Sequence, residues 1–284
     1  MKFMKDFKDY KEKILRDSPR HALEDKFTFA CHPDVSCFGK CCANINIFLT
    51  PYDVLRMKSA KGISSSEFLN EYTIPLSMGE NQLPVVLLKM NEDNEKKCYF
   101  VSDDGKCTIY EDRPWACRMY PIGLASNKTG TGEEGEEFCF IVDESDALCK
   151  GFGGGNETTI DEWMSGQDVQ IFNEKSSSFM HFTLHPYLQE KKTLDTRKIQ
   201  MYLTACYDLD SFRNMIFQST FLNRFDLNKE LTEQLKTDDE ALLEFAVTKW
   251  LRFALFHEDT MIIKDTEMEK GVSSLGWKIE EVEE

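Results

Sequence analysis

The sequence predicts an α+β protein in which a cysteine-rich N-terminal region with a short β-hairpin precedes a mainly α-helical C-terminal region. Nine of the ten cysteines lie between residues 31 and 149. The same region holds short branched apolar runs bounded by turn residues, whereas apolar residues from Ile160 onward recur at helical spacing. We expect four parts: an N-terminal helix (1–30), a cysteine-cluster domain (31–155), a helical domain (156–264) and an acidic tail (265–284).

Composition restricts the classes of partner. The 284 residues include 34 basic and 50 acidic side chains, which gives a net charge of −16 at pH 7, and 41% are hydrophobic. Such a chain has enough apolar surface to fold, and its charge repels nucleic acid. It contains neither the apolar core of a secretory signal nor an apolar run near the ~20 residues that cross a bilayer. We therefore expect a cytoplasmic protein that binds neither nucleic acid nor membrane.

The first element expected is a charged amphipathic helix within residues 1–30, packed on the domain. Its apolar residues recur at steps of three and four, which is the helical period. They are Phe3, Phe7, Tyr10, Ile14 and Leu15.

Capping signals place the next two helices. Thr50 is typical of an N-cap, Pro51 of the first helical position and Asp53 of the third, while Gly62 ends the helix. Ser64 begins a second short helix by the same logic.

A strand and a hairpin follow. Residues 84–90, PVVLLKM, have the branched composition of a strand. Residues 97–110 predict a hairpin around a turn at 102–105, with Cys98 and Cys107 on one face of the ribbon. We expect these two thiols to lie close together.

Two polar segments separate the remaining elements. Residues 127–137, NKTGTGEEGEE, predict a solvent loop, and GFGGG at 151–155 predicts a flexible joint and domain boundary rather than a phosphate-binding loop. The helices expected beyond it are Ile160–Leu184, Leu194–Phe217, Leu227–Leu235 and Thr237–His257. The last would open with a capping box formed by Thr237 and Glu240, and its apolar stripe would be core.

The densest cysteine run is FACHPDVSCFGKCC, which places Cys31, Cys37, Cys41 and Cys42 within twelve residues. In a reducing compartment, thiols gathered this closely suit zinc, Cu(I) or an iron–sulfur cluster, although free cysteines also serve as small buried apolar residues. Gly39 would supply the unusual backbone angles of a loop folded around a metal. Adjacent Cys41 and Cys42 diverge, so one of them would serve a second centre or lie outside the coordination shell.

A second run extends from Cys98 through Cys107 to Cys117. Arg113 and Arg118 flank Cys117, and their guanidinium groups would offset the charge of neighbouring thiolates. The alternative is an ordinary ion pair with Glu111 or Asp112.

Together these runs resemble the YkgJ-type cysteine-cluster proteins, a zinc- or iron-chelating domain family within a superfamily that includes flagellin lysine N-methylases. The resemblance covers about residues 29–151, with a first cysteine spacing longer than in the shortest members and no counterpart for Cys139. It rests on Cys37, Cys41, Cys42, Cys98, Cys107, Ile109, Tyr110, Arg113, Pro114, Cys117, Arg118, Tyr120, Pro121, Cys149 and Gly151.

These patterns predict a thiolate-ligated centre, and eight thiolates could form two sites of four or one cluster with spare ligands. The candidate metal ligands are Cys31, Cys37, Cys41, Cys42, Cys98, Cys107, Cys117 and Cys149. An iron–sulfur cluster is favoured over zinc because His32 is the one imidazole near the cysteines. We expect Cys206 and Cys139 to be core residues, and His181 and His185 to close a helix end.

Two further functions stay open. The superfamily resemblance implies methyl transfer from S-adenosylmethionine to lysines of a protein substrate, although the sequence contains no motif for that donor. The third hypothesis is a structural zinc module whose helical half recruits a protein partner. The chain alone does not decide whether the protein is an enzyme.

Overall fold

The computed structural model describes residues 2–77, 82–92, 95–128, 135–142, 149–190 and 194–264, and it confirms an α+β fold. The strands are β1 (Lys26–Phe29), β2 (Phe48–Leu49), β3 (Thr73–Leu76), β4 (Val85–Leu88), β5 (Ile122–Ser126), β6 (Glu137–Ile141), β7 (Phe152–Thr159), β8 (Phe225–Asp226) and β9 (Ile262–Ile263). They form small antiparallel sheets in the orders β1-β7, β2-β4-β3, β5-β6 and β8-β9.

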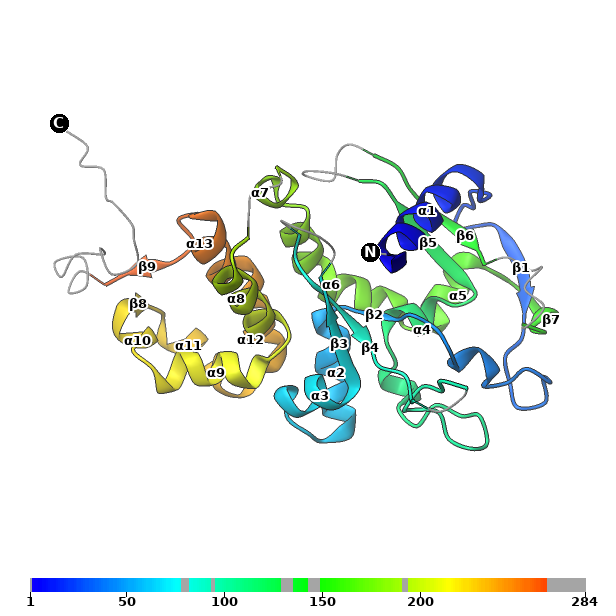
Figure 1. Ribbon diagram of the computed structural model, residues 1–284, viewed down its shortest axis with the longest axis horizontal. Coiled ribbons are helices and arrows are strands. Elements are labelled where there is room, and N and C mark those ends of the chain that lie inside the picture. The colour runs from blue at the N-terminus through cyan, green and yellow to red at the C-terminus, as the bar shows by residue number, and fades with distance from the viewer. Residues whose placement is uncertain are drawn as a thin grey trace.

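The helices are α1 (Lys2–Asp17), α2 (Pro51–Lys61), α3 (Ser65–Tyr72), α4 (Trp115–Met119), α5 (Ile160–Gly166), α6 (Val169–Thr183), α7 (Pro186–Gln189), α8 (Thr196–Cys206), α9 (Leu209–Gln218), α10 (Phe221–Arg224), α11 (Lys229–Thr237), α12 (Asp239–Phe245) and α13 (Leu251–Phe256). Two 3-10 turns, η1 (Lys40–Cys42) and η2 (Tyr110–Asp112), lie in the cysteine-rich region, and a π-helical segment, η3 (Ala246–Trp250), joins α12 to α13. The α1, β1 and β7 elements lie at one end of the molecule, and α8 to α13 lie at the other (Figure 1). None of the helices within the described ranges is both long enough and apolar enough to span a bilayer.

Local capping signals predicted α2 and α3, the helices between β2 and β3, correctly. The Thr50 hydroxyl accepts the Asp53 N–H at 3.1 Å, and the Asp53 carboxylate accepts the Thr50 N–H at 2.8 Å. Gly62 ends α2 with φ +67°, and Ser64 caps α3. The capping box predicted at Thr237 and Glu240 is wrong, because the N-cap of α12 is Asp238, whose carboxylate accepts the Ala241 N–H.

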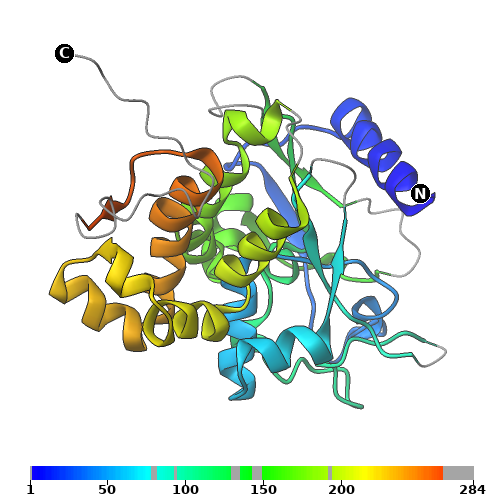
Figure 2. The same ribbon diagram turned by 60° about the vertical axis from the view of Figure 1, so that its left-hand side comes forward.

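The main hydrophobic core crosses the boundary that the sequence predicts. Val54 and Met57 of α2 are buried in the same cluster as Phe172 of α6 and Leu251 of α13. Figures 1 and 2 show α6 running between the helical end and the cysteine-rich end. Residues 31–155 and 156–264 therefore share one core, and the apolar stripe of the last helices lies inside it as expected. Its members Leu243, Val247, Leu251 and Leu255 are buried.

The joint expected at residues 151–155 is instead part of a strand. These glycines lie at the start of β7, which pairs with β1. A Cβ on Gly151 would lie 2.5 Å from the Ala30 carbonyl oxygen, and one on Gly155 would lie 2.8 Å from that of Phe29. The glycines are needed because the two backbones lie in contact, so the prediction of a hinge was wrong.

Two more expectations need correction. Helix α1 ends at Asp17, and residues 26–29 of the expected N-terminal helix form β1. The expected hairpin at 97–110 is reduced to its turn and a single bridge between Val101 and Cys107, while Cys98 bridges to Met90. The tail at 265–284 and residues 129–134 of the expected loop lie outside the described residues.

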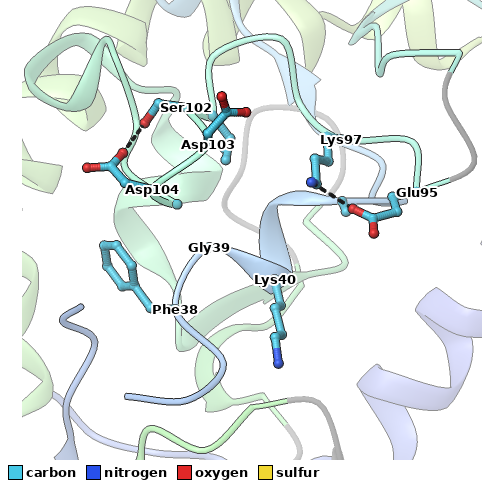
Figure 3. A pocket seen from close by; sticks show the side chains of 11 residues that line it. Phe38, Gly39, Lys40, Glu95, Lys97, Ser102, Asp103 and Asp104 are labelled. Carbon is cyan, nitrogen blue, oxygen red and sulfur yellow. Dashed lines mark hydrogen bonds and ion pairs between the residues drawn. The ribbon is translucent and has the colours of Figure 1, made fainter. Parts of the chain in front are cut away.

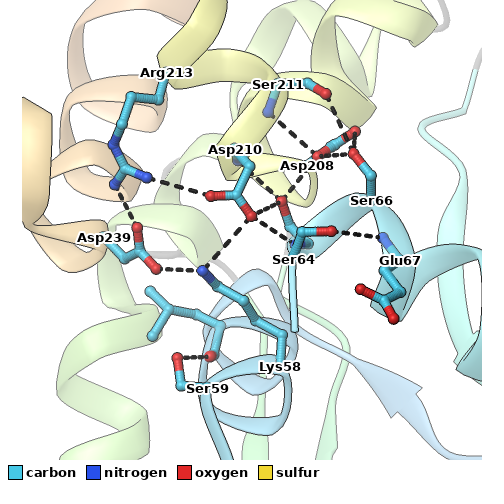
Figure 4. A network of polar contacts seen from close by, with 12 residues as sticks. Lys58, Ser59, Ser64, Ser66, Glu67, Asp208, Asp210, Ser211, Arg213 and Asp239 are labelled. Carbon is cyan, nitrogen blue, oxygen red and sulfur yellow. Dashed lines mark hydrogen bonds and ion pairs between the residues drawn. The ribbon is translucent and has the colours of Figure 1, made fainter. Parts of the chain in front are cut away.

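A polar network joins α2 to the helical end (Figure 4). Lys58 is 8% exposed, and its Nζ lies 2.6 Å from Asp239 and 3.8 Å from Asp210. Arg213 also binds Asp239. Although burial acts in the opposite direction, the bonds from Arg213 and Lys58 hold the pKa of Asp239 below its usual 3.8. The network therefore pairs a buried lysine with ionised partners.

Candidate metal centre

The first cysteine loop is folded by a series of tight turns. After β1, Val35 N–H donates to His32 O at 3.0 Å, and Phe38 N–H donates to Val35 O at 2.8 Å. Gly39 adopts φ +74°, as the sequence predicts, and opens the 3-10 turn that contains the two adjacent cysteines. These turns fold the loop back on itself, so its cysteines come together over a short stretch of chain.

Cys31, Cys37, Cys41 and Cys149 form what we call the outer thiol group. The backbone N–H of Lys150 donates to Cys37 Sγ at 3.1 Å, which brings Cys149 beside the first loop. The pKa of Cys31 is raised to about 11, first by loss of water around the thiolate and then by repulsion from the other three thiols of this group. A distant cysteine thus completes a group begun by the first loop.

Cys42, Cys98, Cys107 and Cys117 form the inner thiol group. Cys98 N–H donates to Cys42 O at 2.8 Å. Burial, and after it the nearby thiols of Cys98 and Cys107, raise the pKa of Cys117 to about 12. Cys98, Cys107 and Cys117 also pack against the main core.

The adjacent cysteines divide between the two groups. A hydrogen bond from the Cys42 thiol lowers the pKa of Cys41 to about 7. The pKa of Cys42 is raised by the same hydrogen bond, by burial and by the nearby thiols of Cys117 and Cys98. Cys41 in turn acts on Cys31. The hydrogen bond between the Cys41 and Cys42 thiols shows that these two side chains lie together, where the two groups meet, rather than pointing apart as the sequence predicts.

Two glycines hold the cysteine loops together. Gly39 and Gly105, both with positive φ, are in backbone contact, since a Cβ on Gly39 would lie 2.7 Å from Gly105 Cα. The contact presses the loop of Cys37 to Cys42 against the turn between Cys98 and Cys107. An open cavity of about 610 Å³ lies beside the contact (Figure 3). Its lining residues are Phe38, Gly39, Lys40, Ala43, Glu95, Lys97, Val101, Ser102, Asp103, Asp104 and Gly105.

Asp53 positions the helix that carries Cys117. Its carboxylate is fully buried and accepts the Trp115 N–H at 2.8 Å, in addition to its bonds with Thr50. Burial raises the pKa of Asp53, and these bonds oppose the rise. One carboxylate thus joins the start of α2 to the start of α4. Sequence reasoning assigned Asp53 a capping role alone, because its second partner lies 62 residues away.

The two arginines beside Cys117 differ in their contacts. Arg118 is 1% exposed, and its guanidinium donates to the backbone carbonyls of Glu111, Arg113 and Gln167. Arg113 donates to the side chain of Gln167, and its charge favours the thiolates of Cys107 and Cys117. Arg113 therefore acts on the inner thiol group electrostatically, whereas Arg118 ties α4 to the α5–α6 junction.

The alternative ion pair for these arginines is not formed by Asp112, which pairs with Arg56 at 2.6 Å. The two cysteines expected to be core residues are both buried. Cys206 is fully buried, and Cys139 is buried within β6 opposite Leu124.

Three histidines were considered in the sequence as ligands or helix ends: His32, His181 and His185. The imidazole of His32 lies 3.5 Å from Asp34 and is half exposed. His181 lies in the last turn of α6, and His185 caps α7 and bonds Glu258 at 2.8 Å, as expected for residues that close a helix end.

The donor chemistry of both thiol groups fits a thiophilic metal. Neighbouring thiols raise the pKa of Cys31 in the outer group and of Cys117 in the inner group, and a bound cation would offset that repulsion and favour the thiolates. Within the described residues, no three Cys, His, Asp or Glu side chains lie close enough to hold an ion as they stand. The thiols are thus gathered at a spacing wider than direct coordination.

Comparison with known families agrees with the cysteine pattern. Residues 30–139 match the family model CxxCxxCC, described as a "putative zinc- or iron-chelating domain". This segment is therefore a cysteine-cluster domain, and the match supports metal binding by the protein. It includes seven of the eight candidate ligands and ends before Cys149. No curated protein and no solved structure matches the chain.

Proposed function

We propose that this protein binds two thiolate-ligated metal centres, one in the outer and one in the inner thiol group. The proposal is supported by the interactions of Cys31 with Cys37, Cys41 and Cys149. It is also supported by those of Cys117 with Cys98 and Cys107, and by the place of Cys42 beside Cys98 and Cys117. Four thiolates are a complete ligand set for tetrahedral zinc and for an iron–sulfur cluster. Bound metal would supply the positive charge that either set lacks and would draw its thiols together.

All-cysteine ligation favours iron–sulfur over zinc at these centres. Zinc sites often include imidazole, and His32, the one histidine of the first cysteine loop, lies against Asp34 at 3.5 Å. Arg113 offsets part of the negative charge of the inner centre. The cluster would give the protein redox chemistry, whereas zinc would leave it redox-silent.

Elemental analysis and an absorption spectrum of anaerobically purified protein test the proposal. A brown protein with broad absorption near ~400 nm and iron with sulfide would support iron–sulfur centres. A colourless protein with stoichiometric zinc would overturn the choice of iron and keep the two thiolate centres. Less than one metal equivalent, both in this sample and after growth with added zinc, would overturn the proposal itself.

The same preparation tests whether the protein binds a methyl donor. The methyltransferase hypothesis predicts that S-adenosylmethionine raises the melting temperature of the metal-loaded protein. An unchanged melting temperature at millimolar donor would remove that hypothesis without affecting the metal centres.

A further inference from the structure

The two thiol groups have different surroundings. Three of the inner cysteines, Cys98, Cys107 and Cys117, pack against the main core that unites both halves of the chain. In the outer group, Cys31 is exposed to solvent, and Cys149 packs against the smaller apolar cluster beneath β1 and β7. Segments with few buried apolar contacts open locally at a lower free-energy cost. The outer group is therefore easier to open than the inner one.

The inner group is also braced by buried polar bonds. The carboxylate of Asp53 and the guanidinium of Arg118, both almost completely buried, fix the two ends of α4, the helix of Cys117. Cys42 O and Cys98 N are held at 2.8 Å. A metal bound here would lose a ligand only if these bonds and the core packing were disturbed together.

The outer group depends on turns at the surface. The loop that carries Cys31 and Cys37 is closed by hydrogen bonds between residues three apart, such as Val35 N to His32 O. A competing ligand can reach a metal only from the solvent, and exposed Cys31 gives it an approach. An incoming donor can thus replace one thiolate at a time, while each released thiolate takes a proton from water.

We propose that the outer thiol group holds its metal exchangeably and is the site of uptake and release, whereas the inner thiol group holds its metal permanently. This inference rests on the proposed function. The partner of the outer site would be a small or protein-borne thiol, or another soft-donor chelator, that accepts the metal by ligand exchange.

The test counts bound metal over time. Full-length protein with its native metal complement is mixed with excess EDTA and followed by native mass spectrometry. We expect two phases of equal size, with the second at least about tenfold slower than the first. A wild-type protein with less than one equivalent at the start would overturn the proposed function. Two equivalents released in a single phase would overturn the exchangeable outer site and leave the two centres standing.

Paired variants assign the phases. Cys31→Ser with Cys149→Ser should abolish the fast phase and leave the slow phase and the melting temperature nearly unchanged. Cys107→Ser with Cys117→Ser should abolish the slow phase and lower the melting temperature; Cys206→Ser is the matched control that keeps both phases. Because the inner variant can fail to fold, the assignment is tested on the outer variant. If Cys31→Ser with Cys149→Ser loses the slow phase and keeps the fast phase, the assignment of the fast phase to the outer thiol group is overturned.

Discussion

The contact between Gly39 and Gly105 provides the most direct test of how the cysteine loops are held together. Both residues have positive φ, at +74° and +81°. Replacement of Gly39 by alanine would place a Cβ 2.7 Å from Gly105 Cα and 2.8 Å from its carbonyl oxygen. These are backbone atoms, so no side chain can rotate away to relieve the clash.

Two costs follow from the Gly39→Ala substitution. The left-handed backbone costs alanine about 1 to 2 kcal/mol relative to glycine. Overpacking adds about 1 to 3 kcal/mol. To reach an ordinary contact of 3.4 Å, the two loops must also separate by about 0.7 Å, whereas metal–ligand distances tolerate only about 0.2 Å. Gly39→Ala should therefore lose both stability and bound metal.

Gly62→Ala is the matched control. Gly62 has φ +67°, and a Cβ there meets nothing within 4 Å, so this variant should show the backbone cost alone and full metal content. Gly105→Ala should be intermediate, since its Cβ would lie 3.1 Å from the Phe38 ring. Denaturant unfolding and elemental analysis measure both effects. If Gly39→Ala matches Gly62→Ala in both, the glycine contact does not hold the thiol groups together.

Three further substitutions test the surrounding structure. Arg118→Met leaves three carbonyls without their donor, and denaturant unfolding should show a loss of at least about 3 kcal/mol in the free energy of unfolding. A loss below about 1 kcal/mol would contradict the role of Arg118 in holding α4. Because the pKa of Asp239 is lowered in the folded state, its stabilising contribution is complete above pH 3.8 and is lost as the pH falls through the lowered pKa. Asp239→Asn should thus destabilise the protein at neutral pH by about 3 to 5 kcal/mol, because it leaves Lys58 with a weaker partner. The variant should also lose less stability than the wild type as the pH falls below 3.8. An unchanged loss of stability at acid pH, measured by pH-dependent unfolding, would contradict this role of Asp239. Cys206→Ser should cost about 1 to 3 kcal/mol in thermal unfolding and leave metal content unchanged, and metal loss would refute its core role.

Sequence predicted best the features that depend on neighbouring residues. The caps at Thr50 and Ser64 and the end of α2 at Gly62 are decided within four positions of chain. The strand at 84–90 and the turn at 102–105 were found for the same reason. The α+β class followed from these local signals together.

Pairing across long separations escaped the sequence pattern. Residues 26–29, KFTF, alternate polar and apolar side chains, and they form β1 because β7 lies beside them, more than 120 residues later. The glycines of 151–155 suggested freedom of the backbone, whereas the structure uses them to bring two backbones into contact. Glycine composition alone does not distinguish a hinge from close packing.

Contacts between distant parts of the chain also decide which candidate metal ligands lie together. Spacing alone groups Cys31, Cys37, Cys41 and Cys42 as one set of four, yet the fold replaces Cys42 with Cys149 in the outer group. The sequence signal for this exchange was the adjacency of Cys41 and Cys42, because two neighbouring cysteines seldom bind one metal ion together. Their shared peptide bond links the two groups covalently. If a metal binds Cys42 in the inner group, it would therefore also limit where Cys41 can lie.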